Sequence, residues 1–339
     1  MIKESVLKII DGEDLSFEES FEVMNKIMTG KVDDSLIAAL LTGLKTKGES
    51  ASEIGGFASS MRSNGIKINC DIENTIDVCG TGGDNSGTFN ISTAASFVVA
   101  GAGLNVAKHG NRSISSSSGS SDVLTELGVN ISLSPEHSER ALDEIGITFL
   151  FAPLYHPAMK HVAEVRRALG FKTIFNMLGP LTNPAGTKKQ LIGVFNDSAS
   201  EKMSSAVDFL DMERVCFICA ENKYDEFILN GAVQISEYHK GKELRTYKIT
   251  SDNFKYSNFH LDEIKGASAA KNAKIILSVL KDKTKNAAYY VVAANAALGL
   301  YASGFSSDFI ECRDAAEESI NSGKAFNKLE ELKKYSIAV

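Results

Sequence analysis

The chain has 339 residues, of which 43% are hydrophobic and 23% charged, with a formal net charge of −7. This composition is typical of a globular protein and excludes disordered and fibrous classes. The acidic balance argues against a nucleic-acid partner, since phosphate contacts along a polyanion need clustered Lys and Arg. The longest apolar runs are too short for a membrane span, and the N-terminus lacks a signal-peptide pattern, so we expect a cytoplasmic protein without a membrane partner.

The first 65 residues predict an all-helical unit. Capping-box patterns stand at residues 16–19 and 50–53, and each precedes apolar residues at helical spacing. Between them, Asp33 or Asp34 can cap a helix that stops near Gly48.

After residue 65, strand-like runs alternate with glycine-rich turns and helix-like segments, which indicates a mostly parallel α/β sheet. The predicted strands are residues 75–78, 104–107, 148–151, 190–195 and 214–218. The predicted helices begin at Ser92, Asp122, Ser138, Pro157, Ser198 and Ala269. The fold class is therefore α/β, with a small all-helical domain and a larger domain whose mostly parallel central sheet is flanked by helices.

The five cysteines form an odd, scattered set that favours reduced thiols over a disulfide framework. Cys216 and Cys219 form a CxxC pair, but no second Cys or His pair completes a zinc set. We expect both in a buried strand.

A glycine-rich turn at residues 80–84 follows the first predicted strand, and an apolar helix begins near Ser92. Glycines let backbone N–H groups approach a ligand closely, and a helix N-terminus adds free N–H groups and positive potential. The pattern predicts a phosphate site but matches neither the dinucleotide fingerprint nor the P-loop. A purely structural turn is the alternative for this motif alone.

A second donor-rich loop follows the next predicted strand. Residues 108–112 read Lys-His-Gly-Asn-Arg, and a serine run occupies residues 115–118. Taken alone, this is an exposed polar loop. Two such loops at the carboxyl ends of successive strands favour a ligand site, because ligands bind at that edge of open α/β sheets.

At these residues the sequence resembles the anthranilate phosphoribosyltransferases, whose marks include a GTGGD turn, an FNxST helix start and a KHGNR loop. The similarity is strong from about residue 77 to residue 195 and weaker towards the C-terminus. The matching stretches are residues 80–84, 89–93, 108–112, 119–124, 151–153, 156–162 and 173–181.

The resemblance implies a nucleoside phosphorylase/phosphoribosyltransferase-like fold. Residues 1–68, joined by a mid-chain helical segment at about 157–182, would form the helical domain. This domain would be hinged to an α/β domain at residues 69–339 that binds phosphoribosyl pyrophosphate (PRPP). A homodimer joined through the helical domains is implied. The implied reaction moves the phosphoribosyl group of PRPP onto the amine of anthranilate, in tryptophan biosynthesis.

The resemblance also implies site residues, carried over position by position. The PRPP-binding residues would be Gly80, Gly83, Asp84, Thr88, Asn90, Ile91, Ser92, Thr93, Lys108, His109, Gly110, Asn111, Arg112, Ser116 and Ser120. The anthranilate-binding residues would be Gly80, His109, Asn111, Pro153, His156, Arg166 and Gly179. No residue is assigned as a general base.

Two of these assignments compete with plainer interpretations. The guanidinium of Arg166 suits a carboxylate through two parallel hydrogen bonds, but Arg166 or the adjacent Arg167 could lie on a solvated helix face. His156 could instead be a helix-entry residue before Pro157.

The resemblance gives Ser92, Asp225 and Glu226 as ligands of two magnesium ions. Adjacent residues in a regular strand point to opposite faces, so Asp225 and Glu226 can serve one metal cluster only on a turn or at a strand end. Oxygen ligands and pyrophosphate suit magnesium. Without the resemblance, two adjacent acids indicate only a charged surface.

Three positions depart from the family pattern: Ser117 replaces a basic residue, Ser121 replaces Ala, and residues 220–222 lack the usual His-Gly. These put PRPP affinity and loop geometry in question. Two other functions compete. A pyrimidine nucleoside phosphorylase would carry a differently spaced, serine-containing glycine turn, and a non-catalytic nucleic-acid-binding relative would be basic and lack intact donor motifs.

Overall fold

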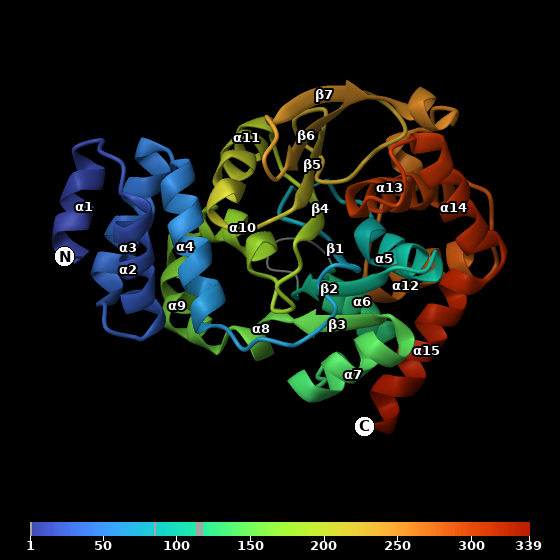
Figure 1. The fold of residues 1–339 in the computed structure, drawn as a ribbon, viewed down its shortest axis with the longest axis horizontal. Helices are drawn as coiled ribbons and strands as arrows, with labels where there is room; N and C mark the ends of the chain where they lie inside the picture. The colour runs from blue at the N-terminus through green and yellow to red at the C-terminus, as the bar shows by residue number, and fades with distance from the viewer. Residues whose placement is uncertain (1, 85, 113–117) are drawn as a thin grey trace.

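Four helices form one end of the molecule, and a larger α/β part forms the rest (Figure 1). The computed structural model describes residues 2–84, 86–112 and 118–339. Together they confirm the predicted fold class, a helical bundle followed by a mostly parallel sheet flanked by helices. The bundle helices are α1 (Ile2–Ile10), α2 (Phe17–Met28), α3 (Asp34–Lys47) and α4 (Ala51–Asn64).

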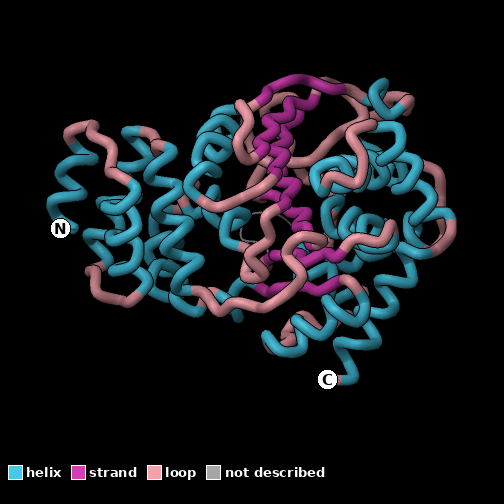
Figure 2. The backbone as a smooth tube through the Cα atoms, viewed as in Figure 1, coloured by secondary structure: helices cyan, strands magenta, loops and turns pink. Residues whose placement is uncertain are grey.

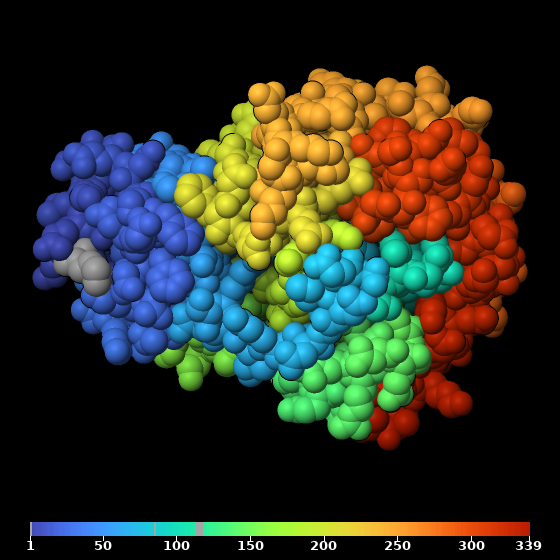
Figure 3. All heavy atoms as spheres, viewed as in Figure 1, coloured from blue at the N-terminus to red at the C-terminus, as the bar shows by residue number. Residues whose placement is uncertain are grey.

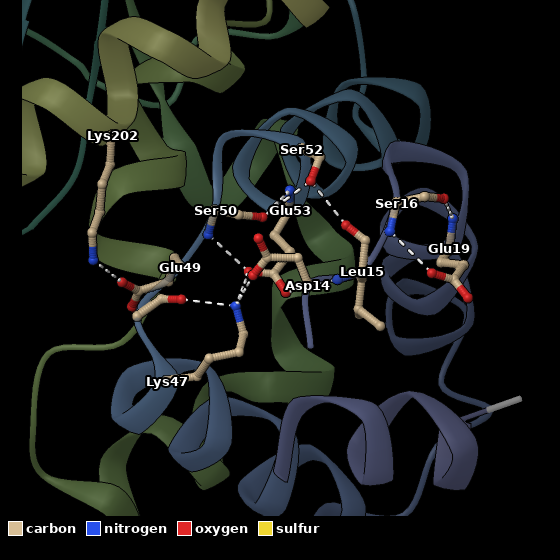
Figure 4. Close-up of polar contacts among 11 residues, drawn as sticks. Asp14, Leu15, Ser16, Glu19, Lys47, Glu49, Ser50, Ser52, Glu53 and Lys202 are labelled. Atoms are coloured by element: carbon tan, nitrogen blue, oxygen red, sulfur yellow. Dashed lines mark hydrogen bonds and ion pairs between the residues drawn. The ribbon is translucent and has the colours of Figure 1, made fainter. Parts of the chain in front are cut away.

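Both predicted capping boxes are confirmed, and Figure 4 shows them side by side. Ser16 caps α2, and Ser50 caps α4 by accepting a hydrogen bond from the backbone N–H of Glu53. The Glu53 carboxylate is fully buried and also accepts hydrogen bonds from the Leu15 N–H and the Lys47 ammonium. Local caps therefore also hold the bundle helices together.

Seven strands form one sheet in the order β3-β2-β1-β4-β5-β6-β7 (Figure 2). The five predicted strands are confirmed and run parallel. The last two strands are antiparallel and were not predicted. The strands are β1 (Thr75–Gly80), β2 (Asn105–Gly110), β3 (Ile147–Phe151), β4 (Lys189–Gly193), β5 (Arg214–Ala220), β6 (Val233–His239) and β7 (Arg245–Ile249).

Helices cover both faces of the sheet, and the predicted helices begin within three residues of their expected starts. Those after β1 are α5 (Ile91–Gly101), α6 (Ser120–Glu126), α7 (Pro135–Ile145), α8 (Ala152–Tyr155), α9 (Lys160–Leu169), α10 (Phe175–Leu178), α11 (Asp197–Ala206), α12 (Ala269–Leu280), α13 (Ala287–Ser303), α14 (Phe309–Asn321) and α15 (Lys324–Ala338). Short 3₁₀ helices are η1 (Pro157–Met159), η2 (Gly179–Thr182), η3 (Val207–Phe209), η4 (Ser251–Phe254) and η5 (Leu261–Ile264). Sequence patterns did not predict α13 to α15.

Two large apolar cores hold these layers together. One lies between the sheet and the C-terminal helices, with the almost wholly buried α13 at its centre. The other joins the bundle to α9, α10, α11 and the opposite face of the sheet, where Val194 and Phe217 contribute. An ion pair between Lys202 of α11 and Glu49 adds to this junction (Figure 4). The division at residues 68/69 stays a prediction.

Among the described residues, no helix has both the length and the apolar character needed to cross a membrane. Cys216 and Cys219 both lie buried in β5, as expected, and all five cysteines are unpaired.

Candidate active site

The glycine turn lies at the carboxyl end of β1, at the edge of the sheet. Gly82 and Gly83 have φ angles of 63° and 68°, in the left-handed region that favours glycine. A Cβ atom on Gly80 would lie 2.9 Å from the Asp225 carboxylate. Glycine therefore both permits this backbone path and lets the acidic loop approach. In Figure 3 the surface is hollowed between the helical bundle and the light-blue part of the chain that follows α4.

Asp225 and Glu226 lie on a loop after β5, which is the condition under which both carboxylates can face one site. An Asp225 Oδ atom accepts a hydrogen bond from the Gly82 N–H at 2.8 Å, and the Asp225 N–H approaches Asp84. A Glu226 Oε atom accepts from the Ser92 N–H at 3.1 Å. The fold thus brings the three predicted metal ligands together.

The two acids are buried close to one another. Burial and the neighbouring carboxylates of Asp84 and Glu226 raise the pKa of Asp225 well above its usual value. Burial raises the pKa of Glu226 to about 7, although Lys108 and the hydrogen bond from Ser92 oppose that shift. Buried like charges of this kind favour a bound cation.

The oxygen atoms at this site fit a magnesium ion that completes its coordination shell with phosphate oxygens of the substrate and with water. Within residues 2–84, 86–112 and 118–339, no three His, Cys, Asp or Glu side chains lie close enough to form a metal site by themselves. Magnesium commonly takes one or two protein carboxylates and completes its shell with water and substrate phosphate oxygens. Asp225, Glu226 and the Ser92 hydroxyl supply oxygen atoms of that kind.

Helix α5 and Lys108 place positive potential beside these acids. The first residues of α5 lie at the sheet edge, so the positive end of its dipole faces the site, where the Ser92 N–H donates to Glu226. Lys108 is only 4% exposed, and its ammonium donates to the Val78 carbonyl at 2.6 Å and to the Ser92 hydroxyl at 3.4 Å. A buried cation next to a helix N-terminus is suited to a phosphate group.

Further described residues of the predicted PRPP set lie at this edge. The Asn90 amide donates to the Ser118 carbonyl, and the Thr93 hydroxyl is buried without a partner among the described residues, as is that of Thr81, which was not predicted. Thr88 lies beside the Ser86 hydroxyl. Ile91 is fully buried, so only its backbone remains for a ligand.

The loop after β2 closes on the start of α6. The Ser120 hydroxyl donates to the Asn111 carbonyl, and a Cβ on Gly110 would lie 2.2 Å from that hydroxyl oxygen. The Asn111 side chain accepts from the Arg112 N–H. Ser116 and Ser117 lie outside the described residues.

Two histidines are buried near Lys108: His109, which follows it on β2, and His156. The rings of His109 and His156 have centroids 5.3 Å apart. Burial lowers the pKa of His109 to about 3 and also lowers that of His156, so both rings are neutral near pH 7. The His109 Nε2 is buried without a hydrogen-bond partner among the described residues.

These histidines, Gly179 and Pro153 were all predicted on the anthranilate side. His156 precedes η1, as a helix-entry residue would, but its ring is also buried and its Nε2 lies 3.0 Å from the Thr182 carbonyl. Gly179 borders open space, since a Cβ there would meet no atom within 4 Å. Pro153 is exposed at the start of α8.

The structure separates the two neighbouring arginines. Arg167 is 75% exposed and pairs with Glu164 on the surface of α9. Arg166 is partly buried, and its guanidinium lies over the Phe175 ring, 5.1 Å from its centroid. No carboxylate forms an ion pair with Arg166 in the part of the chain that the structure describes. Arg166 is thus the one available to an external carboxylate.

Sequence patterns missed one polar group beneath the site. Asp77 of β1 is fully buried and bonded to Asn183 and Gln190. An acid within an otherwise apolar predicted strand was the available signal.

Comparisons with known proteins agree with this geometry. Residues 3–65 match the model "Glycosyl transferase family, helical bundle domain", and residues 72–326 match "Glycosyl transferase family, a/b domain". The chain is 43% identical to the anthranilate phosphoribosyltransferase of Persephonella marina, over 99% of each chain. It is 44% identical to that of Hahella chejuensis, over 99% of this chain and 97% of that protein.

Solved structures give the same result. The crystal structure of the Thermus thermophilus anthranilate phosphoribosyltransferase superposes with a TM-score of 0.92 at 38% identity, covering 98% of this chain and 99% of that one. The Saccharomyces cerevisiae enzyme in complex with PRPP and Mg superposes with a TM-score of 0.91 at 25% identity, covering 100% and 98%. This chain belongs to the anthranilate phosphoribosyltransferase family.

Proposed function

We propose that this chain transfers the phosphoribosyl group of PRPP to the amino group of anthranilate, in tryptophan biosynthesis. The products are N-(5-phosphoribosyl)anthranilate and pyrophosphate. One observation carries the proposal: the glycine turn, the N-terminus of α5, Lys108 and the Asp225–Glu226 pair meet at one edge of the sheet. That combination suits a pyrophosphate and its metal.

On the donor side, the backbone N–H groups of the turn and of α5, with Lys108, neutralise charge on the departing pyrophosphate. Such fixed donors are effective because they need no reorganisation during the reaction. Ser92, Asp225 and Glu226 would hold magnesium, two ions per site, which supplies positive charge to the pyrophosphate oxygens when bound.

On the acceptor side, Arg166 binds the anthranilate carboxylate through parallel hydrogen bonds, with Asn111 and the neutral histidine pair nearby. The ribose becomes oxocarbenium-like as pyrophosphate departs, and the amine attacks C1 from the opposite face. Catalysis then rests on positioning and charge stabilisation. No side chain is assigned as general base, and the ortho carboxylate of the substrate or a water takes the proton.

We further propose a cytoplasmic homodimer joined through the helical bundle. Leu7 and Ile10 of α1 are 59% and 65% exposed, and a second copy would cover them. Light scattering gives the molar mass of the wild type and of the Leu7→Glu, Ile10→Glu variant. We expect a dimeric wild type and a monomeric variant, and a monomeric wild type contradicts the dimer. The unpaired cysteines suit a reducing compartment.

The test of the reaction follows anthranilate fluorescence in a mixture of protein, PRPP and anthranilate, with magnesium present or chelated. Loss of fluorescence that requires both PRPP and magnesium is the expected result. A folded protein that binds PRPP but leaves anthranilate unchanged contradicts anthranilate as the acceptor. Failure to bind PRPP contradicts the proposed function as a whole.

A further inference from the structure

Asp77 is a charged residue in a place where charge is expensive. It lies on β1, three residues before the glycine turn, and is 0% exposed. A buried carboxylate is tolerated only when hydrogen bonds and opposite charge compensate it. Neither the donor side nor the acceptor side described above uses it, so its retention under the site needs an explanation.

Every neighbour bonded to the Asp77 carboxylate is a donor. One oxygen accepts from the backbone N–H of His109 at 3.2 Å. The other accepts from the side-chain amides of Asn183 at 2.8 Å and Gln190 at 3.3 Å. A carboxylate that only accepts hydrogen bonds is satisfied in its ionised form. Asp77 therefore ties β1 to β2, to β4 and to the segment after η2.

The bonds through Asn183 and Gln190 anchor η2. The Asn183 amide donates also to the Ala107 carbonyl at 2.8 Å and accepts from the Ala185 N–H at 2.8 Å. The Gln190 amide donates to the Pro180 carbonyl at 2.8 Å. The backbone of η2 is thereby fixed against the central strands of the sheet.

The buried imidazoles lie against that segment. The His156 Nε2 lies 3.0 Å from the Thr182 carbonyl, and the His109 ring packs against the His156 ring with centroids 5.3 Å apart. Asp77 is therefore bonded to the His109 backbone and, through Asn183 and Gln190, to the segment that contacts His156. The acceptor side of the site thus takes its shape from one carboxylate.

We propose that Asp77 is a positioning residue for anthranilate: its hydrogen bonds to Asn183 and Gln190 hold η2, and its bond to the His109 backbone holds the histidine pair. This inference rests on the proposed function. It concerns residues without direct substrate contact, so the binding constants of the two substrates are the informative quantities.

The experiment compares Asp77→Asn, Asn183→Ala and a control, Thr75→Val. Thr75 is equally buried on the same strand, but its hydroxyl donates to the Asp71 backbone carbonyl and is not bonded to Asn183 or Gln190. Each protein is assayed well below its melting temperature for the Kd of magnesium-PRPP by calorimetry and for the KM of anthranilate.

We expect Asp77→Asn to raise the KM of anthranilate about tenfold, as for loss of a charged hydrogen-bonding group, and to leave the Kd of PRPP within about twofold. Asn183→Ala should raise the KM of anthranilate about fivefold and also leave the Kd of PRPP within about twofold, because neither side chain is bonded to the donor side. Thr75→Val should change neither constant by more than about twofold.

A purely structural role makes a different prediction. Variants with lower melting temperatures but unchanged Kd and KM would overturn the inference. Should Asp77→Asn fail to fold, Asn183→Ala decides alone, and an unchanged KM for anthranilate overturns it. An inactive wild type contradicts the proposed function itself, whereas an active wild type with unaffected variants removes only this inference.

Discussion

Acidic side chains are buried at two places along the same sheet, but their neighbours differ in charge. At the substrate edge, burial and neighbouring carboxylates raise the pKa of Asp225. On β6, Glu237 is only 1% exposed, yet it pairs with Arg214 at 2.9 Å and with His239 at 2.7 Å. Asp225 has too little positive charge beside it to compensate its burial, whereas the partners of Glu237 compensate its charge.

The pKa shifts express the same contrast. Burial raises the pKa of Glu237, but hydrogen bonds from His239 and Tyr301 and the charge of Arg214 bring it below its usual value. Glu226 stays above its usual value at about 7. Buried acids whose pKa values are raised are typical of functional sites, whereas an acid whose charge is compensated by its neighbours is typical of a structural ion pair.

The largest effect is expected where the acids are uncompensated. Asp225→Asn with Glu226→Gln should lower kcat/KM by about a thousandfold, because it removes transition-state charge stabilisation. The free energy of unfolding should not fall, since buried like charges disappear. Fluorescence assays and urea denaturation measure the two quantities. The matched control is Glu330→Gln with Glu331→Gln, which changes two exposed acids that are neighbours in the sequence of α15. A double variant within tenfold of wild type contradicts the assignment.

Substitution of Glu237 should instead lower stability and leave substrate binding unchanged. Glu237→Gln should lower the free energy of unfolding by about 3 kcal/mol, because it leaves the largely buried Arg214 guanidinium without its partner charge. KM values for both substrates should not move. Denaturant titration measures the stability change, and the exposed Asp262→Asn, which breaks a surface pair, should show none. A large KM change for Glu237→Gln would show that the two ends of the sheet are coupled.

Arg166 tests the acceptor side. Arg166→Ala should raise the KM of anthranilate about 30-fold, or about 2 kcal/mol, through loss of a charged hydrogen-bonding partner. Arg167→Ala is the natural control, since that side chain is exposed and paired with Glu164. Steady-state assays with varied anthranilate separate them. Equal effects of the two variants would remove the assignment of Arg166.

The smallest effect concerns pH. His109 has a folded pKa of about 3, so the unfolded chain takes up a proton near pH 6.5 that the folded chain does not. Stability should therefore fall by about 1.4 kcal/mol from pH 7.5 to 5.5 through this group. Glu226 acts in the opposite direction over this range, because its folded pKa is raised. The comparison of wild type with His109→Gln isolates the histidine.

In that comparison, His109→Gln should lack the His109 contribution, and the exposed His260→Gln should retain it. Urea denaturation at both pH values measures the difference. An identical pH dependence for wild type and His109→Gln would mean that the ring takes up a proton in the folded state.

Local patterns predicted local structure well. The capping boxes at Ser16 and Ser50 formed as expected because each needs only residues three positions apart. The five parallel strands were found because each is buried and apolar, with β1 as an example. Strand β7 escaped prediction since most of its side chains are exposed, which weakens the apolar signal.

The candidate site was predicted unevenly. The order of motifs led to the family, and the fold brings Ser92, Asp225 and Glu226 together as that resemblance implied. The binding roles themselves stay predictions. The neighbours of Asp77 were beyond sequence reasoning, because Asn183 and Gln190 reach it only after separate strands have paired.

By itself, the sequence determined the helical beginning, the parallel strands, the glycine turn and the family, since these depend on short-range patterns and on motifs in a fixed order. Only the tertiary structure decided that Arg166 faces inward and Arg167 outward, that two histidines share one buried space, and that Asp77 is bonded to Asn183 and Gln190. Side-chain direction and burial arise from packing between distant segments, and no local pattern encodes them.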